Sequence, residues 1–179
     1  MKPLLALILL AAAATALAQM PGPYGVKERN TGYEEEAPWQ EQQEVELPAF
    51  PKPEDLREFY VGAATANKYL IDASTLAVGS DGVVRYVLVV KTSGGATNIS
   101  FEGIRCKERS WKHYAAGRSD GSWTRPRANR SEWRPIENKP VNRYHAALSR
   151  DYFCPGGIAI YTADEGRNAL RLGKHPNAE

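Results

Sequence analysis

The pattern of apolar positions predicts a β-rich core between residues 69 and 116. Tyr69–Val78 is rich in β-forming residues and ends at a turn signal over residues 79–82. Val83–Lys91 follows, and both of its alternating faces are largely apolar, which is typical of a central strand. Thr97–Cys106 and Ser110–Ala116 continue the pattern after short turns. We therefore expect a meander of about four to five antiparallel strands.

Helical spacing appears only after this core. Apolar residues three and four apart predict a helix over Val141–Phe153, which the Cys154–Gly157 segment ends. Asp164–Leu172 predicts a second, terminal helix, and Ile158–Tyr161 a last short strand. The fold class is then α+β, a single domain over residues 59–176 with one or two C-terminal helices on one face of the sheet.

Residues 19–58 have the composition of an arm. They are rich in Pro, Glu and Gln, with four prolines between Pro38 and Pro53 and almost no hydrophobic periodicity. Such a segment buries too little apolar surface to offset its ordering entropy, so an extended or disordered path is expected. Trp39 and Phe50 are candidate anchors, either on the domain or in another protein. Acids after Pro53 also predict a short helix there.

The first eighteen residues predict a cleavable signal peptide. Lys2 gives a positive start, Leu4–Leu10 an apolar stretch, and residues 16–18 a small-x-small cleavage site after Ala18. A membrane anchor is the alternative, but this apolar run is shorter than the roughly 20 residues that span a bilayer. We expect a mature chain without a transmembrane segment, exported to the periplasm.

Two cysteines remain after cleavage, Cys106 and Cys154. In the cytosol they would be buried thiols. In an oxidising compartment, an even pair in a small domain predicts one disulfide. The two residues are too far apart in sequence for a Cys-x-x-Cys redox motif.

Charge divides the chain unevenly. Residues 27–58 carry a net charge of −6 and residues 59–179 one of +7. Either the acidic arm lies over the basic domain, or the two regions face different partners. Within the basic region, cationic and aromatic residues interleave. The ten residues of this basic-aromatic set are Arg109, Trp111, Lys112, Arg118, Trp123, Arg125, Arg127, Arg130, Trp133 and Arg134.

The basic-aromatic set permits two interpretations. Guanidinium pairing and ring stacking suit an anionic cell-wall or envelope polymer, or an envelope protein. Alternatively, the tryptophans pack the sheet edge while the arginines stack over them or pair with the acidic arm. Nucleic acid is not expected as a partner in the periplasm.

The search for catalytic groups gives one weak candidate. Residues 117–121 match Gly-x-Ser-x-Gly, and Ser119 with His145 or His175 would make a hydrolase. That motif requires a strand before it and a helix after it, and the following residues through Pro126 do not favour a helix. The dispersed histidines predict neither a metal site nor a cofactor. We expect a non-enzymatic binding domain, with the Ser119 hydrolase as the alternative.

Three segments resemble the cryptic neisserial protein family of Gram-negative bacteria. The segments are Asp81–Tyr86, Phe101–Cys106 with Trp111, Lys112 and Tyr114 after it, and Asn142–Cys154. The resemblance covers most of residues 50–155, and it implies a periplasmic location with no established activity. Members of the family are often lipoproteins, whereas Gln19 stands here where a lipid-bearing cysteine would be. No functional residue carries over.

Overall fold

The computed structural model describes residues 37–127, 131–139 and 143–178. Residues Trp39–Glu179 form one compact unit. The expected signal peptide, residues 19–36 and Arg130 lie outside the described residues. Within these ranges, no helix is both long and apolar enough to cross a membrane.

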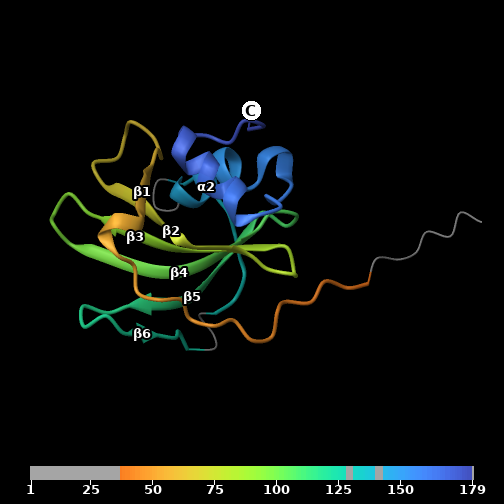
Figure 1. The fold of residues 1–179 in the computed structure, drawn as a ribbon, viewed down its shortest axis with the longest axis horizontal. Helices are drawn as coiled ribbons and strands as arrows, with labels where there is room; N and C mark the ends of the chain where they lie inside the picture. The colour runs from red at the N-terminus through yellow and green to blue at the C-terminus, as the bar shows by residue number, and fades with distance from the viewer. Residues whose placement is uncertain (1–36, 128–130, 140–142, 179) are drawn as a thin grey trace, which may run out of the picture. The chain divides into compact units, whose positions relative to one another are not determined.

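An antiparallel sheet forms the centre of this unit (Figure 1). Its strands follow one another in chain order from β1 to β6, and β7 pairs with β5 beside β6. The described strands are β1 (Leu56–Phe59), β2 (Lys68–Val78), β3 (Val83–Lys91), β4 (Thr97–Arg105), β5 (Ser110–Gly117), β6 (Trp123–Thr124) and β7 (Arg134–Pro135).

The four expected core strands are confirmed within one or two residues, but the strand count was too low. The described sheet has seven strands rather than four to five. The prediction of a short helix after Pro53 is wrong. Only the 3-10 turn η1 (Pro53–Asp55) forms there, and β1 begins at the next residue. Leu56–Phe59 then pairs with β2, so its backbone groups bond to the sheet instead. Ile158–Tyr161 forms no strand.

The helices cover one face of the sheet (Figure 1). A five-residue helix α1 (Arg143–Ala147) continues into the π-helical segment η3 (Leu148–Phe153), and the short turn η4 (Pro155–Gly157) precedes α2 (Ala163–Leu172). Their buried side chains, among them Leu148 and Phe153, pack against Tyr86 and Ile104 of the sheet. We call this side of the sheet the helix face.

The opposite side of the sheet packs against residues 39–50, which we call the arm. Val87 and Phe101 form a second apolar cluster there, and Val45 and Leu47 of the arm pack against it. In Figure 1 this segment runs along the side of the sheet away from the helices. The compact unit that begins at Trp39 therefore includes this segment. We call this side the arm face.

The predicted disulfide is present between Cys106 and Cys154, whose Cα atoms are 5.5 Å apart. It joins the residue after β4 to the residue after η3. Both cysteines are buried. The bond thus ties the helical layer to the sheet.

Candidate functional site

A pocket lies on the helix face, where the outer edge of β5 is shared by two short strands. β6 pairs with Ala116 and Gly117 near one end of β5, and β7 pairs with Ser110 and Trp111 at the other. A cavity of about 840 Å³ opens there, and it is lined by Ser100, Glu102, Trp111, His113, Ala116, Thr124, Arg125, Pro126, Arg127 and Arg134.

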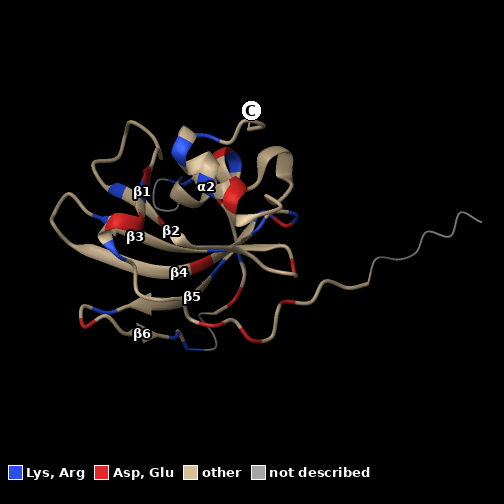
Figure 2. Ribbon diagram, viewed as in Figure 1, with Lys and Arg blue, Asp and Glu red and all other residues tan. Residues whose placement is uncertain are grey.

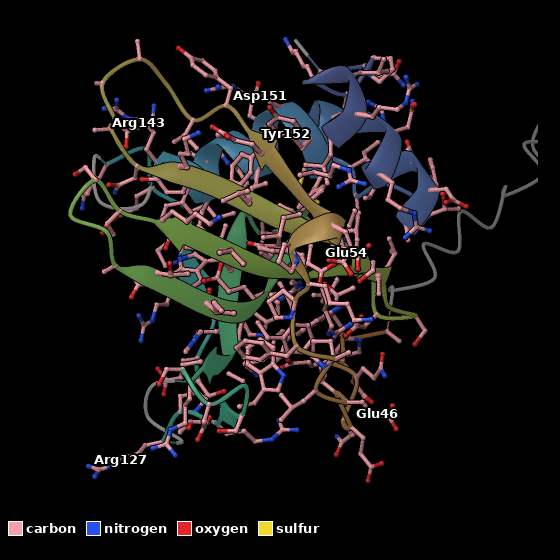
Figure 3. All side chains as sticks on the ribbon, turned by 60° about the vertical axis from the view of Figure 1, so that its left-hand side comes forward. Glu46, Glu54, Arg127, Arg143, Asp151 and Tyr152 are labelled. Carbon is pink, nitrogen blue, oxygen red and sulfur yellow. A yellow bond between two sulfur atoms is a disulfide. The ribbon has the colours of Figure 1, made fainter. Side chains whose placement is uncertain are left out.

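Three arginines give this pocket its basic rim. Arg125 and Arg127 follow β6, and Arg134 belongs to β7. All three are exposed, and Figure 3 shows Arg127 extending from the chain that follows β6. The Arg134 guanidinium lies 5.6 Å from the centre of the Trp111 ring, which holds it at the rim by a cation–π contact. Guanidinium groups in such a cluster suit carboxylate or phosphate groups.

Glu102 of β4 supplies a carboxylate to the same pocket, although its residue is only 3% exposed. The Ser100 hydroxyl donates to its Oε1 at 2.7 Å, and the Tyr86 hydroxyl to its Oε2 at 3.3 Å. His145 Nε2 lies 2.8 Å from Oε2. Burial raises the pKa of this carboxyl, but interaction with His145 and the Ser100 hydrogen bond lower it by more. The pKa of Glu102 therefore lies below its ordinary value, and the group is ionised at neutral pH.

His145 is fixed in its position by aromatic rings. Its imidazole stacks on Trp111 with 3.8 Å between ring centres and contacts Tyr144 at 4.1 Å. The residue is completely buried. His113, in contrast, is half-buried and pairs directly with Glu102 across β4 and β5. The pocket thus combines a held carboxylate and a partly accessible imidazole with three guanidinium groups.

A second polar cluster lies on the arm face, around Glu41 of the arm. Lys112 Nζ donates to both of its carboxylate oxygens at 2.9 and 2.8 Å, the Tyr114 hydroxyl donates at 2.9 Å, and Trp133 Nε1 at 3.2 Å. Burial raises the pKa of Glu41, whereas the hydrogen bonds from these three side chains and the Lys112 charge lower it by more. The carboxylate therefore stays ionised in this cage, with a pKa below its ordinary value.

Trp39 fixes the beginning of the arm. Its indole Nε1 donates to the Asp81 carbonyl at 2.8 Å, and the Arg105 guanidinium lies 3.8 Å from its ring centre. Trp133 contacts the same ring edge-on at 5.9 Å. Asp81 is itself held by Arg85, at 2.6 Å. Trp39 therefore anchors on its own domain, and so does Phe50, whose ring packs on Trp123 at 5.4 Å.

The structure divides the basic-aromatic set into separate groups. Trp111, Arg125, Arg127 and Arg134 line the pocket. Lys112, Trp123 and Trp133 contact the arm instead, Trp123 through a 2.9 Å hydrogen bond to the Pro48 carbonyl. Arg118 is exposed in the turn after β5. Arg109 lines a different cavity beside the disulfide, and Arg130 is outside the described residues.

These groups match both interpretations of the set in part. The acidic arm does lie over basic side chains, and arginine does stack on tryptophan, as the structural interpretation expects. Figure 2 shows the acidic positions of the arm and the basic positions after β6 on the ribbon. The three pocket arginines are exposed, and Arg125 also donates to the Val45 carbonyl of the arm.

Sequence reasoning missed the acidic part of the pocket. Ser100, Glu102 and His113 were not among the residues predicted from the sequence to form a site. One signal was available, the position of Glu102 on the strand face that packs against the helices. Burying a carboxylate without a partner costs free energy, so its presence there indicates that polar partners lie nearby. Its partner His145 is 43 residues away in sequence, and no local pattern links them.

Ser119 lies in an exposed turn and not at a strand-to-helix elbow. The turn is closed by backbone hydrogen bonds, from Arg118 to Ser122 and from Gly121 to Arg118, and β6 follows. His145 and His175, its suggested partners, bond to Glu102 and Glu165. The hydrolase alternative therefore gains no support. In the described ranges, no group of three or more His, Cys, Asp or Glu residues is placed to hold a metal ion.

The fold and pocket define a disulfide-bonded α+β protein with a meander sheet and a basic cavity at the sheet edge. Comparison with known proteins then gives the family: the chain belongs to the CNP1-like family, which matches residues 34–171. It is 29% identical to "Cryptic neisserial protein 1" of Neisseria gonorrhoeae (strain ATCC 700825 / FA 1090) over 166 residues. That match covers 83% of this chain and 80% of the gonococcal protein. No solved structure matches the chain.

Proposed function

We propose that the protein is an exported, periplasmic binding domain that takes up an anionic ligand without chemical conversion. The observation that carries the proposal is the cluster of Arg125, Arg127 and Arg134 around a cavity of about 840 Å³. Cavities of roughly 300–1,000 Å³ are typical of small-ligand sites. The ligand is then a small anion, or the anionic end group of an envelope polymer.

Binding rather than catalysis is supported by how the polar groups of the pocket are held. Glu102 already accepts hydrogen bonds from Ser100 and Tyr86 and contacts His145. A carboxylate ionised below its ordinary pKa is a poor general acid and base at neutral pH. The planar, charged guanidinium groups of the three arginines suit recognition of an anion.

Calorimetric titration with citrate, inorganic phosphate and trigalacturonate tests the binding proposal. We expect saturable binding of at least one of these anions by the unmodified protein. The double variant Arg127→Gln/Arg134→Gln should weaken it about tenfold or more, because charge-assisted hydrogen bonds are lost. Arg118→Gln/Arg171→Gln removes the same charge from exposed positions outside the pocket and should retain near-normal affinity. If both double variants lost anion affinity equally, the loss would reflect net charge alone, and the pocket would be rejected as the binding site.

Export is proposed from the leader, and the disulfide supports it. A disulfide is stable in an oxidising compartment such as the periplasm. Mass spectrometry of periplasmic extract should therefore find a chain that begins at Gln19 and contains no free thiol. Protein with residues 1–18 still attached, or thiols that react with alkylating reagent before reduction, would contradict this location.

A further inference from the structure

The pocket contains charges of both signs, which a site for simple anions does not need. Glu102 lines the same cavity as Arg125, Arg127 and Arg134. Its carboxylate is ionised, so a ligand that carries only negative charge is repelled by it. A carboxylate in a low-dielectric position increases that repulsion, because water screens it little. An occupant with a positive or hydrogen-donating group beside Glu102 avoids this cost.

We propose that the pocket binds a zwitterion, a short peptide of two or three residues. Its carboxylate lies among the rim arginines, and its ammonium group is bound by Glu102 with Ser100 and His113 beside it. This inference rests on the proposed anion-binding function of the pocket and names the ligand class that the same site takes.

The free acceptor capacity of Glu102 agrees with this assignment. A carboxylate accepts about four hydrogen bonds. Oε2 interacts with the Tyr86 hydroxyl and His145 Nε2, and Oε1 accepts from the Ser100 hydroxyl. Oε1 therefore retains capacity for a further hydrogen bond, as from an ammonium group. The fixed partners also preorganise the carboxylate, which lowers the ordering cost of binding.

The separation of the two charges fits a short peptide. Glu102 is on β4, whereas the arginines lie on β7 and just after β6, on the far side of β5. Neighbouring strands are roughly 4.8 Å apart, so these two parts of the site are separated by about 10 Å of backbone. An extended chain spans roughly 3.3–3.6 Å per residue. Two or three residues therefore place an amino terminus and a carboxyl terminus at the two parts together.

Other groups around the pocket favour the same orientation. Ser100 and His113 flank Glu102 on the same sheet face, and they offer further oxygen and nitrogen atoms to an amino terminus. Thr124 and Trp111 also line the cavity. The mixed polar and apolar lining suits a peptide backbone with small side chains.

Three matched ligands test the assignment by calorimetry on the unmodified protein. L-alanyl-L-alanine carries both charges, its N-acetyl derivative only the carboxylate, and its methyl ester only the ammonium group. We expect the dipeptide to bind at least tenfold more tightly than either derivative. Glu102→Gln should bring the dipeptide and its N-acetyl derivative to similar affinities, because it removes both the attraction for the ammonium group and the repulsion of a lone carboxylate. Glu108→Gln, an exposed acid outside the pocket, is the matched control.

The outcomes separate this inference from the proposed function. Equal affinity for the dipeptide and its N-acetyl derivative would overturn the zwitterion assignment while anion binding stands. Binding of phosphate or citrate together with no binding of any of the three peptide ligands would also overturn the zwitterion assignment and leave anion binding intact. Failure of every anion and peptide to bind would overturn both. If Glu102→Gln does not fold, the ligand comparison on the unmodified protein still decides.

Discussion

The carboxylate of Glu41 meets three donors that come from β5 and from the segment before β7. A hydrogen bond to a charged group stabilises a fold by about 1.5–3 kcal/mol, more than a hydrogen bond between neutral groups. The side chains of Glu41 and Lys112 are 23% and 15% exposed, so water screens their pair only in part. This single residue therefore contributes a large share of the binding of the arm to the sheet.

Acid should release the arm. The pKa of Glu41 is lower in the folded protein than in the unfolded chain, so its stabilisation is complete above the unfolded value of about 4.3 and declines as the pH falls through the folded value. Hydrogen exchange reports this at the Gln42 amide, which donates to Asp81 in the docked arm. We expect its protection, relative to amides of β3, to decrease on acidification below the ordinary pKa of a glutamate side chain.

Neutralising the same carboxylate should mimic acid at neutral pH. Glu41→Gln is expected to weaken arm docking by about 1–2 kcal/mol, which corresponds to roughly tenfold faster exchange at Gln42. Glu46→Gln is the matched control, since Glu46 is exposed on the same arm and extends away from the sheet (Figure 3). Comparable exchange in the two variants would show that the Glu41 cage does not hold the arm.

At the scale of elements, Gly103 lets three strands pack closely on the arm face. A Cβ atom at this position of β4 would lie 2.9 Å from Val83 Cγ1 and 2.9 Å from Tyr114 Cε2. Val83 is completely buried, and the Tyr114 hydroxyl is bonded to Glu41. Neither side chain can move away without disturbing its own contacts.

Gly103→Ala should therefore lower the free energy of unfolding by about 1–3 kcal/mol, the usual cost of overpacking a well-filled interior. Denaturant unfolding followed by tryptophan fluorescence measures this change. Gly94→Ala supplies the comparison, because a Cβ there meets only Thr92 Oγ1 at 3.9 Å in an exposed turn. Equal stability of the two variants would contradict the close packing.

Elements with many local apolar residues were predictable, and elements made by distant partners were not. Val83–Lys91 has buried residues along most of its length, and its sequence shows this without any structure. β6 and β7 have two residues each and form only because β5 presents an open edge. β1 was mistaken for a helix because acids after a proline favour helix initiation, whereas pairing with β2 decides its backbone. Propensity is a weak guide where tertiary pairing supplies the hydrogen bonds.

The candidate site follows the same rule. The basic and aromatic residues were visible in the sequence, but their division between pocket and arm face depends on strand alternation and on the path after β6. Lys112 and Trp111 are neighbours in sequence yet point to opposite sides of the sheet, Lys112 to the arm and Trp111 to the helices. The Glu102–His145 contact required the packing of a helix on the sheet.

At the scale of the whole unit, the disulfide is the covalent link between the sheet and the helical layer. Cys106 and Cys154 are 48 residues apart, and closing a loop of this length stabilises a fold by about 4 kcal/mol in the chain-entropy treatment. Cys106→Ala/Cys154→Ala should lose about this amount in denaturant unfolding. The unmodified protein should lose a similar amount in reducing agent, whereas the variant should not respond to it. A variant as stable as the unmodified protein would contradict this role.

Arg125 takes part in two regions of the molecule at the same time. Its Nη2 donates to the Val45 carbonyl of the arm at 3.1 Å, and its side chain also lines the cavity on the helix face. Any molecule that enters the cavity and engages this guanidinium either keeps the bond to Val45 or competes with it. Where the ligand competes with that bond, its binding to the cavity and the docking of the arm change each other's equilibrium constant by the same factor. Arg125 can thereby couple ligand binding on the helix face to docking of the arm on the opposite face of the sheet.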